Sequence, residues 1–379
     1  MKNVLEWLEA TVAKYPDKPA FSDTESNITF RQVYDIARNT GAYLIEQLGV
    51  DRTPVAVFAG RIMVTPAYFL GVVYAGRPYA PIDASLPDKR IEKILENLCP
   101  RAIVADRESL EHVESIVDEL AKSEGFDRPQ IFIAEDISRF EQVACADSNC
   151  KISESSGDAV TDSENDTDGG VVAGCAGKTD DSSLEKLAAV RRQMSMTDPL
   201  YIIYTSGSTG NPKGVMTSHL SLMTYINAYC EVMHIEGDDV LGNQSPLDYI
   251  AAIRDIYLPL KTGCSTAIIP KEYFMEPNAL FDYMNDKKVS SVGWSVSAFT
   301  ILTSLGAFEE VGLKSLRKIC FSGSVMPCRV LRKWQENLPE AHFVNQYGPT
   351  EATASCTYYS VDHTVEDDEV LPIGRAYDN

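Results

Sequence analysis

The chain has 379 residues, 44% of them hydrophobic and 23% charged, a composition that fits a globular protein with sizeable cores. Its 34 basic and 55 acidic side chains give a formal net charge of -21, so we expect no nucleic-acid partner, because phosphate backbones attract basic faces. The nine cysteines form no paired C-x-x-C pattern, and no signal peptide or membrane-length apolar run is present, so we expect a cytoplasmic protein without membrane contact.

Helices and strands are predicted to alternate over residues 1–146, which we expect to form a first α/β subdomain. The apolar spacing predicts helices at 4–12, 67–75 and 109–124. Short apolar runs predict strands at 28–30, 55–58, 102–105 and 130–134. Thr29 is placed to cap a further helix over residues 31–48.

Residues 147–195 have a different composition, dominated up to about residue 185 by Asp, Ser, Gly and Thr. A segment of this kind buries little apolar surface. Its acidic positions do not match the spacing of an EF-hand. We therefore expect a disordered insertion and connector before the second subdomain.

The α/β alternation resumes in residues 196–379, the expected second subdomain. Strands are predicted at 199–204, 266–269, 291–294, 318–321 and 342–347, and Ser218 is placed to cap a helix. Three of these strands end in turns rich in glycine or polar residues. In open parallel sheets, ligands bind at the carboxyl ends of the strands.

The turn after the strand at 199–204 is suited to a polyphosphate. Its glycines let backbone N–H groups approach an anion, and its hydroxyls and Lys213 add donors. Neither the P-loop pattern nor G-x-G-x-x-G is present. A flexible Ser/Gly linker is the alternative interpretation.

The turn at 345–351 offers the other groups that a nucleotide needs. Tyr347 presents a flat face for a purine, and the amide of Asn345 could pair with an adenine edge. Thr350 supplies a hydroxyl, and Glu351 a carboxylate of the kind that Mg²⁺ prefers. Alone, this turn could be an ordinary β-turn, but with the first turn it indicates a nucleotide site.

The pair Y-T-S-G-S-T-G-x-P-K-G and N-x-Y-G-P-T-E resembles the adenylate-forming superfamily. That superfamily includes amino-acid adenylation domains of nonribosomal peptide synthetases, D-alanine–carrier-protein ligases and acyl-CoA synthetases. Residues 28–33, 75–83 and 371–375 also resemble family segments, so the resemblance covers all but the acidic segment. It implies layered, mostly parallel sheets flanked by helices, in two flavodoxin-like subdomains, with a small C-terminal lid that this sequence lacks.

The resemblance implies that a carboxylate, favoured to be an amino acid, attacks the α-phosphorus of ATP to give an acyl-adenylate and pyrophosphate. The acyl group would then pass to the phosphopantetheine thiol of a carrier protein, with Mg²⁺ as cofactor. Thr205, Lys213, Thr350 and Glu351 would be catalytic, and Glu351 would also hold the metal. The residues expected to bind the nucleotide are Ser206, Gly207, Ser208, Thr209, Gly210, Gly323, Ser324, Asn345, Tyr347 and Gly348.

The substrate motif is less clear. Amino-acid adenylating relatives hold the amine with an aspartate in an F-D-x-S-type motif, and Asp248 stands in a similar phrase. Anchoring instead on residues 254–257 places Ile250 at that position, and Asp248 could be a helix N-cap. His219 is expected either to be exposed in the first turn of a helix or to stand behind the phosphate turn.

The sequence ends at Asn379, before the ribose-binding aspartate, the hinge and the lid lysine of the family. We therefore expect a fragment with weak ATP binding and little or no adenylation alone. The alternatives are an acyl- or aryl-CoA ligase of the same superfamily and a non-catalytic nucleotide-binding paralogue.

Overall fold

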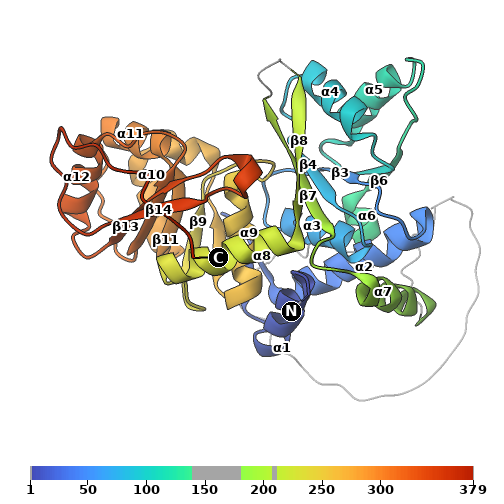
Figure 1. Ribbon diagram of the computed structural model, residues 1–379, viewed down its shortest axis with the longest axis horizontal. Helices are drawn as coiled ribbons and strands as arrows, with labels where there is room; N and C mark the ends of the chain where they lie inside the picture. The colour runs from blue at the N-terminus through green and yellow to red at the C-terminus, as the bar shows by residue number, and fades with distance from the viewer. Residues whose placement is uncertain (1, 139–180, 207–210, 379) are drawn as a thin grey trace, which may run out of the picture.

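The computed structural model describes residues 2–138, 181–206 and 211–378 (Figure 1). Two sheets organise these residues, as predicted for an α/β protein. The smaller sheet has the strand order β6-β5-β3-β4-β7-β8, parallel throughout except for the antiparallel β7–β8 hairpin. Its strands are β3 (Val55–Phe58), β4 (Tyr79–Ile82), β5 (Ala102–Ala105), β6 (Gln130–Ile133), β7 (Pro199–Ser206) and β8 (Pro212–Ser218).

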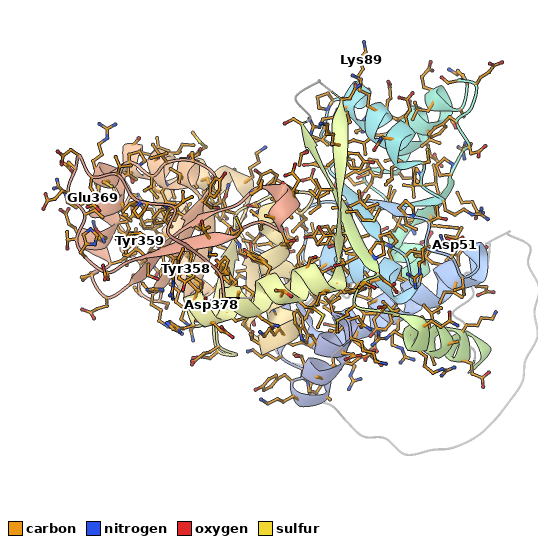
Figure 2. All side chains as sticks on the ribbon, in the orientation of Figure 1. Asp51, Lys89, Tyr358, Tyr359, Glu369 and Asp378 are labelled. Atoms are coloured by element: carbon orange, nitrogen blue, oxygen red, sulfur yellow. The ribbon has the colours of Figure 1, made fainter. Side chains whose placement is uncertain are left out.

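The larger sheet has the order β15-β14-β13-β12-β11-β9-β10-β1-β2. Its central strands run parallel, while β2, β14 and β15 are antiparallel at the edges. At one edge, Arg375 donates to the hydroxyl of Tyr358, which is labelled in Figure 2. The strands are β1 (Pro19–Ser22), β2 (Asn27–Thr29), β9 (Val240–Asn243), β10 (Ser265–Ile268), β11 (Ser291–Ser295), β12 (Lys318–Ser322), β13 (His342–Tyr347), β14 (Thr357–Val361) and β15 (Arg375–Ala376).

Three hydrophobic cores arrange the helices and sheets in five layers. One core joins α4 and α5 to the outer face of the smaller sheet. The largest core lies between the sheets and contains α1, α2, α3, α8 and α9. The third joins α10, α11 and α12 to the far face of the larger sheet (Figure 1). The helices are α1 (Leu5–Lys14), α2 (Phe30–Leu48), α3 (Thr65–Tyr74), α4 (Asp88–Leu98), α5 (Leu110–Leu120), α6 (Ala134–Ser138), α7 (Asp181–Gln193), α8 (His219–Met233), α9 (Ile253–Thr262), α10 (Pro277–Asp286), α11 (Val296–Ser304) and α12 (Cys328–Asn337), with 3-10 turns η1 (Ile250–Ala252), η2 (Lys271–Met275) and η3 (Thr350–Ala352).

Both predicted helix caps are confirmed. The Thr29 hydroxyl accepts from the Gln32 N–H, and the Gln32 side chain accepts from the Thr29 N–H, which completes a capping box on α2. The Ser218 hydroxyl accepts from the Ser221 N–H at the start of α8. Across the described ranges, every helix is too short or too polar to cross a membrane.

Each sheet contains strands from both sides of the subdomain boundary that was expected near residue 196. β7 and β8 extend the sheet built from residues 55–133, because Tyr201 on β7 pairs beside Tyr79 on β4. β1 and β2 join the larger sheet, since β1 pairs in parallel with β10. Most of the expected acidic insertion lies outside the described residues. Its last part forms α7, because Leu187 and Val190 are buried in the central core.

Candidate functional site

The β7–β8 hairpin and the turn after β13 bring the two sequence motifs together. Thr205 on β7 faces Lys213 on β8 in the register of the hairpin. η3, which begins at Thr350 and includes Glu351, lies against β8, so groups from both sheets meet at one place (Figure 1). The predicted residues Gly207, Ser208, Thr209 and Gly210 lie outside the described part of the chain.

The polar side chains at this meeting point are free to bind a ligand. Lys213, Glu351 and Ser206 are exposed, and Thr205 and Thr350 are half-buried. With the described residues, none of these five side chains makes a hydrogen bond or an ion pair. A free ammonium group, three hydroxyls and a carboxylate are therefore available beside the hairpin, a donor set that fits a polyphosphate and one divalent cation.

Gly348 fixes the turn that follows β13. A Cβ at this position would lie 2.7 Å from the backbone nitrogen of Cys356, and closer still to the Cα of Ser355. The Cys356 N–H donates to the Tyr347 carbonyl at 2.9 Å and closes the turn. The Tyr347 side chain is 52% exposed, so its ring is open for stacking.

Asn345, Gly323 and Ser324 lie at the same carboxyl edge of the larger sheet. β12 and β13 are parallel neighbours, with Phe321 opposite Asn345. Gly323 has φ of +97° and turns the chain away after β12, with Ser324 exposed beside it. Asn345 is buried, and its Nδ2 donates to the Pro372 carbonyl at 2.9 Å, so one amide hydrogen is already used within the protein.

Asp248 lies in the loop between β9 and η1 and is not a helix cap. The residue before η1 is Tyr249, and no side chain caps that turn, so the N-cap interpretation is wrong. Asp248 instead borders a cleft of about 870 Å³ between the sheets, together with Asp83. Burial and the neighbouring Asp83 carboxylate raise the pKa of Asp248. A role in binding an amine stays a prediction.

His219 is buried, with 1% of its surface exposed, so the expectation of an exposed histidine is wrong. The segment before α1 covers the first turn of α8, and the Val4 N–H donates to the imidazole Nδ1 at 3.4 Å. Burial lowers the pKa of His219 to about 4, so the ring is neutral at pH 7.

Sequence reasoning missed two arginines close to the site. Arg61 follows β3 and donates to the carbonyls of Asn243 and Ile269, both at 2.7 Å, which ties the smaller sheet to the larger one. Burial lowers the pKa of Arg61 to about 10. Arg254 on α9 is fully buried behind β11. Two features of the sequence could have identified them: Arg61 follows shortly after a buried strand, and Arg254 lies inside a largely apolar helix.

The structure is that of an α/β protein with a group of exposed and half-buried polar side chains at the carboxyl edge of a sheet. A family model described as "AMP-binding enzyme" matches residues 8–379, and the chain belongs to this family. The chain is 28% identical over 373 residues to the D-alanine–D-alanyl carrier protein ligase of Bacillus cereus (strain Q1), covering 98% of this chain and 64% of that protein. The corresponding ligase of Bacillus anthracis is also 28% identical, with 98% and 63% covered.

Solved structures confirm the predicted fold. The nonribosomal peptide synthetase FmoA3 (S1046A) superposes with a TM-score of 0.74 at 19% identity, covering 99% of this chain and 34% of that chain. Holo-AB3403, a four-domain nonribosomal peptide synthetase bound to AMP and glycine, superposes with a TM-score of 0.71 at 18% identity, covering 99% and 23%. The chain spans about 64% of the length of the curated relatives that it matches.

Proposed function

We propose that this chain carries the nucleotide-binding part of an ATP-dependent acid–thiol ligase. The enzyme activates a carboxylate, an amino acid, as an acyl-adenylate and releases pyrophosphate. The observation that carries the proposal is the contact of η3 with β8, because it places Thr350 and Glu351 beside the hairpin of Thr205 and Lys213. Family membership supports it, and curated relatives at 28% identity are ligases for a carrier protein.

In this proposal the reaction is a displacement at phosphorus. A carboxylate oxygen attacks the α-phosphorus of ATP, the bond from that phosphorus to the bridging oxygen breaks, and pyrophosphate leaves. Two anions must approach each other, so the protein acts mainly by positioning and by neutralising charge.

Side chains from both turns have a role in that step. Lys213, with the hydroxyls of Thr205, Ser206, Ser208 and Thr209, holds the β- and γ-phosphates, and Thr350 contacts the α-phosphate. Glu351 holds Mg²⁺, which neutralises phosphate charge when bound. The remaining predicted residues bind adenine. Tyr347 stacks on the ring and Asn345 contacts its edge. The backbone at Gly323, Ser324 and Gly348 lines the pocket.

The proposed acceptor is the phosphopantetheine thiol of a carrier protein in the cytoplasm. The names of the ligase relatives support this choice, and the AMP and glycine bound to AB3403 support a small amino acid as the acid in that protein. The thiol would attack the acyl carbon and release AMP.

Exchange of labelled pyrophosphate into ATP by the full-length protein, measured with a panel of amino acids and plain carboxylic acids, tests the proposal. We expect exchange that depends on one class of acid and on Mg²⁺, followed by thioester formation on a carrier protein. Thioester formation on coenzyme A alone would favour the acyl-CoA ligase. Tight binding of AMPPNP without exchange for any acid would contradict the proposal and favour a non-catalytic paralogue.

A further inference from the structure

Five polar side chains are buried together behind the turn that carries Tyr347 and Glu351. They come from four parts of the chain: α8, α9, the segment from β13 to the residues after η3, and the end of the described chain. Each has at most 5% of its surface exposed. This Arg254 cluster consists of Tyr225, Arg254, Gln346, Ser355 and Tyr377.

Arg254 is buried, and among the described residues no carboxylate makes a direct ion pair with it. One Nη donates to the Gly293 carbonyl at 2.6 Å, and the guanidinium lies 5.6 Å from the centre of the Tyr229 ring. The carboxylate of the neighbouring Asp255 accepts a hydrogen bond from Asn243 Nδ2 at 2.8 Å instead. Asp255 attracts the guanidinium without contacting it directly. Because a buried guanidinium is costly without a directly bonded anion, Arg254 can accept a carboxylate in contact with it.

Other donors of the cluster are also poorly paired. Arg254 Nε, the hydroxyls of Tyr225 and Tyr377, and Gln346 Nε2 have no partner at good hydrogen-bond geometry among the described residues. Tyr225 interacts only loosely with Ser355 and Arg254, and Tyr377 with Gln346. The Oε1 of Gln346 already accepts from the Ser355 hydroxyl at 3.3 Å, which leaves its amide hydrogens as donors. Buried polar groups are almost always well paired, so four poorly paired groups in one cluster indicate that the cluster can take a further acceptor.

The position of the cluster connects it to the proposed chemistry. Tyr225 and Ser355 line a cavity of about 310 Å³ that also reaches Ala352 at the end of η3. Gln346 directly precedes Tyr347 on β13. The Tyr377 ring stacks on Tyr358 at 5.0 Å, which holds it over the cluster (Figure 2 labels Tyr358).

The guanidinium is held firmly in place. A Cβ at Gly293 would lie 2.7 Å from Arg254 Cζ, so the absence of a side chain lets the guanidinium pack flat on β11. A planar guanidinium held in this way is suited to bind a carboxylate through two parallel hydrogen bonds.

We propose that the Arg254 cluster binds a second acidic group of the acid activated at this site, so that the substrate is a small dicarboxylic acid such as an acidic amino acid. This inference rests on the proposed function. The carboxylate that reacts lies toward Thr350, and the other accepts hydrogen bonds from Arg254, Gln346 and the tyrosine hydroxyls.

Calorimetric titration of the full-length protein with matched pairs of acids tests the inference without requiring turnover. The pairs are aspartate and asparagine, glutamate and glutamine, and succinate and succinamate. We expect the acidic member of at least one pair to bind roughly tenfold or more tightly than its amide, because hydrogen bonds between charged groups are the strong ones.

Arg254→Gln is expected to reduce that preference by roughly tenfold to a hundredfold. The control Arg329→Gln, on the exposed side of α12, should leave it unchanged. If Arg254→Gln does not fold, as judged by circular dichroism, Gln346→Leu provides the test, because it removes a poorly paired donor and keeps the charge. It should weaken binding of the acid severalfold and leave AMPPNP binding intact.

The inference is overturned if no acid binds, if the amides bind as tightly as the acids, or if the foldable variant keeps the full preference. The affinity for AMPPNP, measured by calorimetry on the same samples, tests the proposed function separately. Loss of AMPPNP binding would refute the function, whereas normal AMPPNP binding without preference for acids would refute only the inference.

Discussion

At Gly348, the backbone of Ser355 and Cys356, just before β14, leaves no room for a side chain. Gly348→Ala should shift the turn away from Ser355 and Cys356 and lower stability by about 1–3 kcal/mol. It should also weaken AMPPNP binding, since Tyr347 directly precedes the glycine and Thr350 follows two residues later. Urea unfolding and calorimetry measure both effects. Gly312→Ala is the matched control, because its Cβ would meet nothing within 4 Å; equal effects of the two substitutions would contradict this account.

The buried His219 makes the stability of the fold depend on pH. Its pKa is about 4 in the fold against an ordinary 6.5, so the unfolded chain binds a proton more readily between these values. The contribution to stability is therefore complete above pH 6.5 and is lost as the pH falls toward 4. We expect the free energy of unfolding to fall by about 2 kcal/mol from this group between pH 7 and pH 5.

Urea unfolding of the wild type and of His219→Gln at these two pH values measures that contribution. The variant should lose less stability on acidification than the wild type. His112→Gln, which alters an exposed histidine paired with Asp88, is the control and should keep the wild-type dependence. The same pH dependence in His219→Gln as in the wild type would argue against a buried neutral ring.

Candidate site residues could be predicted from the sequence where a short motif identifies them. The sequence names Lys213, Thr350 and Glu351, and their side chains make no hydrogen bond or ion pair with the described residues. It could not reveal that Arg254 and His219 are buried, because the groups that cover them come from distant parts of the chain.

At the scale of elements, α2 begins at the capping box of Thr29 and Gln32. Thr29→Ala should lower stability by about 1 kcal/mol, because an N–H at the helix start loses its acceptor. Gln47→Ala, exposed in the last turn of the same helix, should change stability by less than about 0.5 kcal/mol. Thermal unfolding compares the two, and an equal loss in both variants would exclude a specific cap.

Most strands with strong apolar runs were predicted within a residue or two of their observed ends, including β3, β5, β7, β11 and β13. β8 (Pro212–Ser218) was not predicted, because its Lys213 and Gly214 are exposed and its pairing with β7 supplies the structure. β14 is only half-buried along most of its length, so its sequence lacks a clear alternation. Pairing with neighbouring strands in the folded protein determines whether such segments form strands.

At the scale of the whole molecule, Arg61 joins the two sheets. Arg61→Met should cost about 2–4 kcal/mol, because buried carbonyls of Asn243 and Ile269 lose their donor. Hydrogen exchange of backbone amides near Arg61 and Asn243 should become faster, because the link between the two sheets opens more often. Arg107→Met, which removes an exposed ion pair with Asp136, is the control. A loss below about 0.5 kcal/mol in Arg61→Met would show that the sheets are held by their shared core alone.

The exchange of strands between the two sheets could not be predicted from chain order. A boundary placed near residue 196 follows the composition, but β7 completes the smaller sheet and β1 the larger one. Both strands bury apolar side chains in the assembled layers, and chain order alone does not specify this arrangement.

The central claim is that the β7–β8 hairpin and the turn after β13 hold one nucleotide between them. Calorimetric titration of AMPPNP with Mg²⁺ into the full-length wild type, Lys213→Ala and the exposed control Lys314→Ala tests it most directly. The account predicts binding to the wild type and control, and affinity roughly tenfold or more weaker for Lys213→Ala. Equal affinity in all three proteins, or no binding to the wild type, would contradict it.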